Sequence, residues 1–177
     1  HLAKHLYQDG ANLIVSDILP DRAEKAKKEF KAKVVDPEEI YNVQCDIFAP
    51  CAFGAVINDK TIPQLKCKVV AGSANNQLKE DKHGIALGKS GILYAPDFII
   101  NAGGVINVAD GFYGYNRERA LKKVEGLYNI VLEIFKISKS NGISTNDAAL
   151  KLAEERLQLA ADLSSKIRVG PGKDILL

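Results

Sequence analysis

The chain has 177 residues, of which 46% are hydrophobic and 26% are charged, and these values suit one soluble α/β domain or a domain with an appendage. A net charge of +2 is too small to predict a nucleic-acid-binding surface. No apolar run approaches the ~20 residues of a membrane-spanning helix, so we expect neither a nucleic acid nor a membrane as a partner.

Short apolar runs alternate with helical patterns over the first hundred residues. A helix is predicted to end near Gln8, and helices are also predicted at Asp21–Phe30, where Asp21 and Glu24 have capping-box spacing, and at Pro37–Tyr41. The strand signals lie at Asn12–Ser16, Ala32–Val35, Cys45–Ala49, Lys68–Ala71, Ile92–Ala95 and, more briefly, Phe98–Ile100. Strands and helices that alternate through short loops predict an α/β fold, a doubly wound parallel sheet with helices on both faces.

The pattern changes after Gly104. Residues Arg117–Ser140 have apolar side chains at helical spacing, and Asn141 and Gly142 are expected to end this helix. Ser144 is expected to cap a second helix that runs to about Lys166. Two long helices after a sheet predict an appendage that packs against another part of the protein.

The sequence contains no methionine, and it begins at His1 inside a predicted helix. We therefore expect it to be a piece of a longer protein, for which the absence of a signal peptide carries no information.

Cysteines and histidines give no sign of a metal site. Cys45, Cys51 and Cys67 form no C-x-x-C motif, so buried reduced thiols are expected rather than ligands or disulfides, and a cytoplasmic location follows. His5 and His83 have no cysteine, histidine or carboxylate cluster near them in the sequence, so no metal-binding or catalytic role is expected of either.

Candidate ligand-binding residues follow the strands, because ligands of such sheets bind at the carboxyl ends of the strands. Asp17 follows a strand and precedes a helix, where a carboxylate can accept hydrogen bonds from the ribose hydroxyls of NAD and repel the 2′-phosphate of NADP. A cap of the following helix explains the same residue. A glycine-rich phosphate loop would lie about 20 residues before such an acid, and the chain begins 16 residues before Asp17.

Two further strand ends carry small residues and asparagines. In the segment 71–76, Gly72 and its small neighbours would let a ligand approach the backbone, although a tight turn requires much the same composition. In the segment 101–104, the glycine pair can open a helix, and Asn101 could bind a carboxamide such as that of nicotinamide.

Longer strings carry a family resemblance: VSDI at 15–18, CDIFAPCAFGAVIND at 45–59, TIPQLK at 61–66, AGSANNQL at 71–78, YAPDFIINAGGVINVAD at 94–110 and YGYNRERA at 113–120. Together they resemble the glutamate, leucine, phenylalanine and valine dehydrogenases, with the leucine dehydrogenases as the nearest branch.

This resemblance implies a Rossmann-type sheet that lacks its first, central strand and the glycine-rich loop. Residues 1–110 would form part of the NAD-binding domain, and residues 111–177 a hinge helix and a terminal helix that pack towards a substrate domain. The intact enzyme would be a homo-oligomer that deaminates a branched-chain L-amino acid with NAD. Its catalytic Lys and Asp would lie outside this chain, so no activity is expected of the chain alone.

Carried onto this sequence, the family's pattern implies two sets of binding residues. The cofactor set is Asp17, Cys51, Ala52, Ala71, Gly72, Ser73, Ala74, Asn75 and Asn101. Val131 and Ile134 match the substrate side-chain pocket, although ordinary helix core is an alternative explanation for both. A valine or phenylalanine dehydrogenase, a non-catalytic NAD-binding module and a different Rossmann enzyme such as a methyltransferase remain alternatives.

Overall fold

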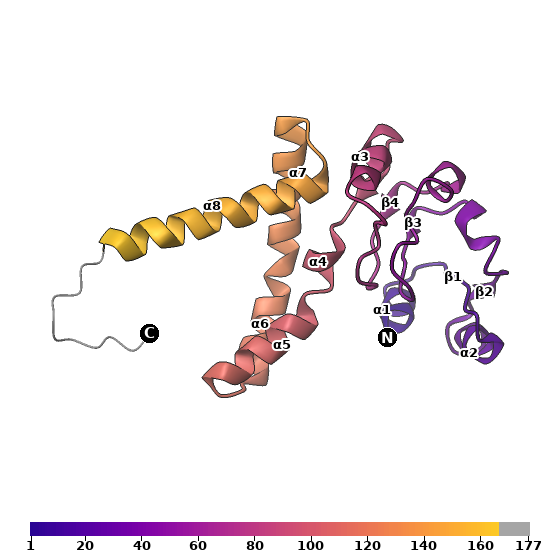
Figure 1. Cartoon of the computed structure of the whole chain (residues 1–177). Coiled ribbons are helices and arrows are strands. Elements are labelled where there is room, and N and C mark those ends of the chain that lie inside the picture. Colours follow the sequence, from indigo (N-terminus) through magenta and orange to yellow (C-terminus); the bar gives the residue numbers. More distant parts are fainter. Residues whose placement is uncertain (167–177) are drawn as a thin grey trace.

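The computed structural model describes residues 1–166, and Figure 1 shows an α/β part followed by a helical part. The α/β part has five short strands with helices between them, as the alternating pattern predicted. Its elements are α1 (Leu2–Gln8), β1 (Ile14–Val15), α2 (Pro20–Phe30), β2 (Lys33–Val34), η1 (Ile40–Asn42), β3 (Ile47–Phe48), η2 (Ile62–Gln64), β4 (Val69–Val70), α3 (Lys82–Lys89) and β5 (Leu93–Tyr94).

The strands form two parallel sheets. One sheet has the order β1–β2 and the other has the order β3–β4–β5, and in the described part of the chain no strand pairing joins β1 to β3. The common Rossmann order is 3-2-1-4-5-6. Removing strand 1 from this order leaves a pair and a triplet of parallel strands, so the predicted fold class, a Rossmann-type sheet without its first strand, is confirmed.

The core of the α/β part lies between the three-stranded sheet and α3. It contains Ile57, Ile62, Val70, Leu87, Ile92 and Tyr94. Val70 and Tyr94 come from neighbouring strands and Leu87 from α3, so the core ties the sheet to the helix that follows β4.

The predicted capping box at the start of α2 is wrong. Leu19 takes the N-cap position without a side-chain cap, and Pro20 is the first helical residue, which suits its fixed φ and missing N–H. The Asp17 carboxylate instead accepts a hydrogen bond from the Leu19 backbone N–H at 2.9 Å. The chain therefore turns into α2 through a local loop held by Asp17.

The last predicted strand is helical in the structure. Phe98–Ile100, predicted as a strand, belongs to α4 (Asp97–Ile100), because Ile99 packs into a helical core and its β propensity is overruled by that contact. The other elements are α5 (Gly103–Asp110), η3 (Gly111–Tyr113), α6 (Arg117–Glu125), α7 (Leu127–Asn141) and α8 (Thr145–Lys166).

The long helix predicted over Arg117–Ser140 is two helices. Gly126 separates α6 from α7, and a Cβ at this position would lie 3.2 Å from the Lys123 carbonyl oxygen, so the interruption suits glycine. The second predicted cap is confirmed: the Asp147 N–H donates to Ser144 Oγ at 3.1 Å at the start of α8. The prediction for residues 167–177 lies outside the described residues.

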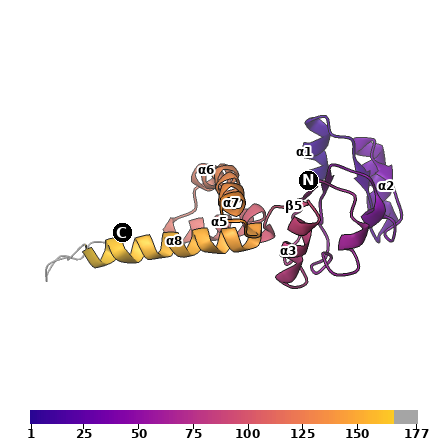
Figure 2. The same ribbon diagram turned by 90° about the horizontal axis from the view of Figure 1, so that it is seen from above.

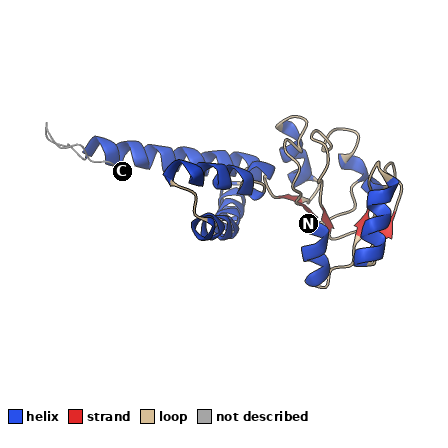
Figure 3. Ribbon diagram, turned by 90° about the horizontal axis from the view of Figure 1, so that it is seen from below, coloured by secondary structure: helices blue, strands red, loops and turns tan. Residues whose placement is uncertain are grey.

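Helices α7 and α8 pack around Ile134, Ala148, Ala149 and Leu152. Beyond this core α8 projects away from the rest of the molecule (Figures 2 and 3). Its outer turns expose Leu157, Leu159 and Leu163. None of the helices over residues 1–166 is long and apolar enough to cross a membrane.

Helix α4 packs against α7, and α5 packs against α6 and η3. This packing groups α4 and α5 with the helices that follow them, and the domain boundary at residue 110 stays a prediction. The side chain of Asp97 still bonds to the α/β part, so the two parts are joined at this point.

Candidate functional site: the carboxyl edge of the parallel sheets

The predicted binding residues follow the carboxyl ends of parallel strands. Asp17 follows β1, Cys51 follows β3, and Gly72 follows β4. Parallel strands that are hydrogen-bonded together end at the same edge, so the loops after β3 and β4 meet there, and the loop after β1 occupies the equivalent edge of the smaller sheet.

Asp17 borders an open hollow at the edge of the smaller sheet. Val35 and Asp36, which follow β2, line the same hollow together with the first turn of α2. Within residues 1–166 the Leu19 N–H is the only hydrogen-bond partner of the Asp17 carboxylate, and it uses one of the two oxygens. The turn-forming role is therefore present, and the second carboxylate oxygen is available for a ligand.

Cys51 and Ala52 are exposed after β3, so the expected burial of the thiol is wrong for Cys51. Cys45 and Cys67 are half-buried and free, and burial raises the pKa of both thiols. Only Cys51 can therefore meet a ligand at this edge.

Gly72 is buried and is required by the protein's own backbone. A Cβ on Gly72 would lie 2.0 Å from the Pro50 carbonyl oxygen and 2.4 Å from the Pro50 nitrogen. The Ala74 N–H donates to that same carbonyl at 3.0 Å. The glycine thus lets the loops after β3 and β4 pack directly on each other, whereas the sequence suggested close approach to a ligand.

The rest of the 71–75 segment alternates between buried and exposed positions. Ser73 and Asn75 are exposed, Ala74 is buried, and Ala71 is half-buried. Asn101 Nδ2 donates to Asn75 Oδ1 at 2.5 Å, so the structure brings two of the predicted residues together. Two linked side-chain amides at this edge offer both donors and acceptors to a polar ligand.

A buried network behind this loop was missed by the sequence analysis. The Gln77 side-chain amide donates to the carbonyls of Gly72 at 2.7 Å and Ala74 at 3.0 Å. The Gln77 backbone N–H donates to Asp97, whose other oxygen accepts from the Tyr94 hydroxyl at 2.7 Å. The burial of the phenol raises the pKa of Tyr94.

This network fixes the carbonyls of the loop after β4 and leaves its exposed side chains outward. Gln77, Tyr94 and Asp97 are almost fully buried. Tyr94 and Asp97 stand three residues apart in the string YAPD, and this spacing was the one available signal of the network.

The glycine pair opens a helix, as predicted. Gly103 begins α5, so the backbone N–H groups of its first turn have no partner within the helix. The segment before it is α4, so Asn101 follows a helical turn and not the predicted strand.

The two predicted pocket residues lie in different surroundings. Ile134 is fully buried in the helical core, where it meets α8, and Val131 is half-buried one turn earlier on α7. Of the two, Val131 keeps surface that a ligand or another part of the protein can contact.

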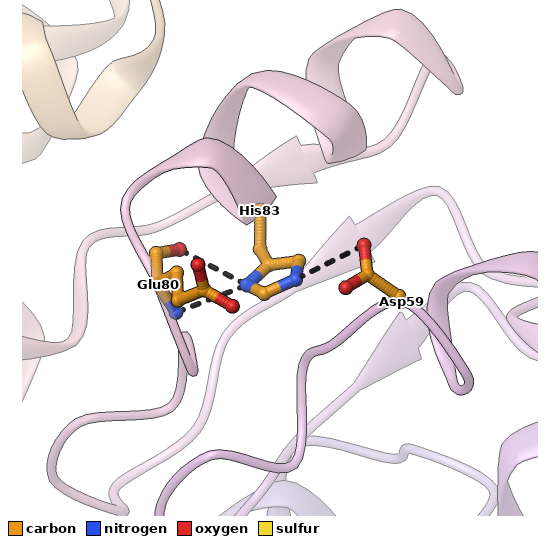
Figure 4. A group of neighbouring side chains, drawn as sticks. All are labelled: Asp59, Glu80 and His83. Atoms are coloured by element: carbon orange, nitrogen blue, oxygen red, sulfur yellow. Dashed lines mark hydrogen bonds and ion pairs between the residues drawn. The ribbon is translucent and has the colours of Figure 1, made fainter.

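His83 has the carboxylate neighbours that the sequence analysis did not expect. Asp59 and Glu80 lie beside it in the structure, so the statement that no cluster surrounds it is wrong (Figure 4). Asp59 is 24 positions away along the chain, and only the fold brings the two residues together.

The chain is similar to known proteins over most of its length. The family described as Glutamate/Leucine/Phenylalanine/Valine dehydrogenase matches residues 15–110. The leucine dehydrogenase of Bacillus cereus is 62% identical over 157 residues, 89% of this chain and 43% of the relative. That of Bacillus subtilis (strain 168) is 58% identical over 158 residues, again 89% of this chain and 43% of the relative.

A solved relative has the same fold. The crystal structure of L-tryptophan dehydrogenase from Nostoc punctiforme is similar with a TM-score of 0.87 at 50% identity, over 89% of this chain and 48% of that chain. The chain belongs to the glutamate/leucine/phenylalanine/valine dehydrogenase family, and it spans less than half the length of these relatives.

Proposed function

We propose that this chain is the cofactor-binding part of an NAD-dependent dehydrogenase that deaminates a branched-chain L-amino acid such as leucine, valine or isoleucine. In this reaction the amino acid, NAD⁺ and water give the 2-oxo acid, ammonium, NADH and a proton. The relatives named leucine dehydrogenase support this choice of substrate, since they are 58–62% identical to the chain.

The observation that carries the proposal is the half-free carboxylate of Asp17 at the end of β1. One oxygen of Asp17 is held by the Leu19 N–H, which orients the side chain, and the second has no hydrogen-bond partner within residues 1–166. A fixed carboxylate after a Rossmann strand suits the two ribose hydroxyls of NAD, and its charge opposes a 2′-phosphate.

The residues at the larger sheet fit the other end of the cofactor. Ser73 and Asn75 are exposed on a loop whose carbonyls are fixed from behind by Gln77, and Asn101 lies against Asn75. We assign Asn101 to the nicotinamide carboxamide, residues 71–75 to the adjoining ribose, and Cys51 and Ala52 to the adenosine side. When bound, NAD accepts a hydride from the substrate Cα.

Within this proposal, this chain binds and orients the cofactor, and residues in the rest of the protein move the protons. Val131 borders the substrate side chain. The exposed aromatic side chains of the helical part, such as Phe112 (84% exposed) and Tyr113 (74% exposed), support contact with a substrate domain or with further copies in a homo-oligomer.

The test is Asp17→Ser in the full-length protein that carries this chain, with Asp21→Ser as the matched control. Asp21 lines the same hollow, but it lies in the first turn of α2 and is assigned no ribose contact. Loss of charge-assisted hydrogen bonds, worth about 1.5–3 kcal/mol, should lower kcat/KM for NAD about 10–100-fold and narrow the NAD/NADP ratio. An unchanged ratio would leave Asp17 with its turn-forming role alone.

The same assay separates the substrate alternatives. Leucine, valine, phenylalanine and tryptophan are compared at saturating NAD. Preference for an aromatic amino acid would redirect the proposal within the family, and NAD binding without turnover of any of them would identify a non-catalytic binding module.

A further inference from the structure

His83 lies at a cluster that the proposed dehydrogenase reaction does not use. The cluster joins the loop after Ile57 to the start of α3, and one ligand atom each from Asp59, Glu80 and His83 lie within 4.8 Å of one another. We propose that these three side chains bind a divalent transition-metal ion of the Zn²⁺ type and that the ion holds the loop against α3.

The spacing of His83 and Asp59 suits a shared ion better than a direct hydrogen bond. His83 is fully buried, and its Nε2 has no hydrogen-bond partner within residues 1–166. Nε2 points at Asp59 Oδ1 across 3.4 Å (Figure 4), which exceeds the usual 2.7–3.2 Å of an N–H···O bond. Two tetrahedral zinc ligands with bonds of about 2.0–2.2 Å stand roughly 3.4 Å apart.

The other ring nitrogen, Nδ1, lies beside both a donor and an acceptor of the Glu80 backbone. The Glu80 backbone N–H donates to Nδ1 at 3.0 Å, and the Glu80 carbonyl oxygen lies 3.1 Å from the same nitrogen. Without an ion Nδ1 therefore accepts the Glu80 N–H. Binding an ion through Nε2 requires the other tautomer, in which Nδ1–H donates to the Glu80 carbonyl and the Nε2 lone pair is free. Metal-ligating histidines almost always donate their second N–H to a carbonyl or carboxylate in this way.

The carboxylates supply the remaining charge and access to solvent. Asp59 is 74% exposed and Glu80 is 52% exposed at the side chain, so each can rotate towards the ion and water can complete the coordination. One imidazole nitrogen with two carboxylates suits zinc, whereas Mg²⁺ and Ca²⁺ favour ligand sets made of oxygens.

Lys82 competes for the same carboxylates. Its ammonium lies 3.4 Å from Asp59 Oδ2 and 3.3 Å from Glu80 Oε1. Since its side chain is 56% exposed, it can swing into solvent when the ion binds. Removing this positive charge should strengthen metal binding.

The experiment measures zinc binding by isothermal titration calorimetry with the full-length protein that carries this chain. The protein is stripped with a chelator, and Cys51→Ser is included in every variant so that the exposed thiol binds no zinc. Asp59→Asn and His83→Gln should each abolish one zinc site per chain or weaken it by at least the ~10–100-fold that loss of an outer-shell partner costs. His5→Gln, which alters an exposed histidine on α1, should bind as the parent does.

Asp59→Asn keeps the result interpretable if His83→Gln unfolds, because Asp59 is on the surface. Zinc should also raise the Tm of the parent and not that of Asp59→Asn, and Lys82→Gln should bind zinc more tightly than the parent. Zinc binding that survives both ligand substitutions, or equal binding of Mg²⁺, overturns the proposal. A parent with no zinc site of this kind also overturns it, and the NAD proposal is unaffected because the two clusters share no residue.

Discussion

The α/β part and the helical part bury their side chains in different ways. In the α/β part, a sheet and α3 enclose Val70, Tyr94 and Leu87, and the loops at its edge bond to one another. In the helical part, a small core around Ile134 is buried while large apolar side chains of α5, η3 and α8 stay exposed.

This difference suits the two parts to different tasks, the α/β part to binding a cofactor and the helical part to contact with other protein. In the α/β part, the three-stranded sheet and α3 form a packed core and present polar groups at one edge, which is what a binding site for a polar cofactor needs. The helical part presents apolar surface, which is stable in water only when other protein covers it. The comparison predicts that substitutions in one part act on packing within that part.

The largest expected effect tests whether the two cores are separable. Ile134→Ala should cost about 2–5 kcal/mol, because the side chain is fully buried and its removal leaves a cavity. Amide hydrogen exchange should accelerate in α7 and α8 and stay slow in β4 and β5. Leu87→Ala is the matched change in the other core and should give the opposite pattern. Uniform acceleration in both variants would show that the parts unfold as one unit.

The next effect concerns the loops of the α/β part. Gly72→Ala should destabilise by about 1–3 kcal/mol or more, because the added methyl overlaps the Pro50 backbone and the loops after β3 and β4 must separate. NAD binding by the full-length protein should weaken with it. Denaturant unfolding measures the first change and a binding titration measures the second.

Gly88→Ala provides the control for this substitution. Gly88 is helical and no atom lies within 4 Å of its added Cβ, so the same change should stabilise by about 0.5–1 kcal/mol. An equal loss of stability at both glycines would contradict the view that the close approach of Gly72 to Pro50 makes a methyl group at residue 72 destabilising.

The sequence predicts the local features of this molecule and misses those that depend on tertiary contacts. Local patterns located each of the five strands and the cap at Ser144, because apolar runs and caps are properties of short segments. The pattern at Phe98–Ile100 gave the wrong element, since a tertiary contact of Ile99 decides its structure. The pairing of Asn75 with Asn101, the bonds of Gln77 and the approach of Asp59 to His83 depend on the fold, and a single sequence does not contain them.

A third prediction concerns acid stability of the helical part. Asp110 is buried and accepts hydrogen bonds from Arg119 at 2.6 Å and 2.9 Å and from the Asn116 N–H at 2.7 Å. The hydrogen bonds from Arg119 lower the pKa of this carboxyl, with help from Asn116 and from the charge of Lys123.

A lowered folded-state pKa means that the unfolded chain binds the proton more readily. The stabilisation is therefore complete above the unfolded pKa of about 3.9 and is lost as the pH falls through the folded value. The Tm of the parent should fall steeply below about pH 4, and Asp110→Asn should start lower and show a shallower slope there. Equal slopes in the two proteins would show that other carboxyls govern acid unfolding.

The smallest expected effect is on substrate choice, and it separates two residues that the sequence could not distinguish. Val131 and Ile134 share one face of α7, but Ile134 is fully buried against α8 while Val131 is half-buried. In the full-length protein, Val131→Ala should enlarge an aliphatic substrate pocket, because it shortens a side chain that lines it. It should therefore raise kcat/KM for phenylalanine relative to leucine. A pocket distinguishes one methylene by only ~1–3 kcal/mol, so the ratio should change by about 10–200-fold at most. Ile134→Ala should lower stability and leave this ratio unchanged, and Leu132→Ala, on a different face of the same helix, should alter neither the ratio nor NAD binding.

The measurement is kcat/KM for both amino acids in the four proteins. A ratio that moves with Ile134 and not with Val131 would place the pocket on the other side of α7, and a ratio that moves with neither would assign the pocket to the rest of the protein.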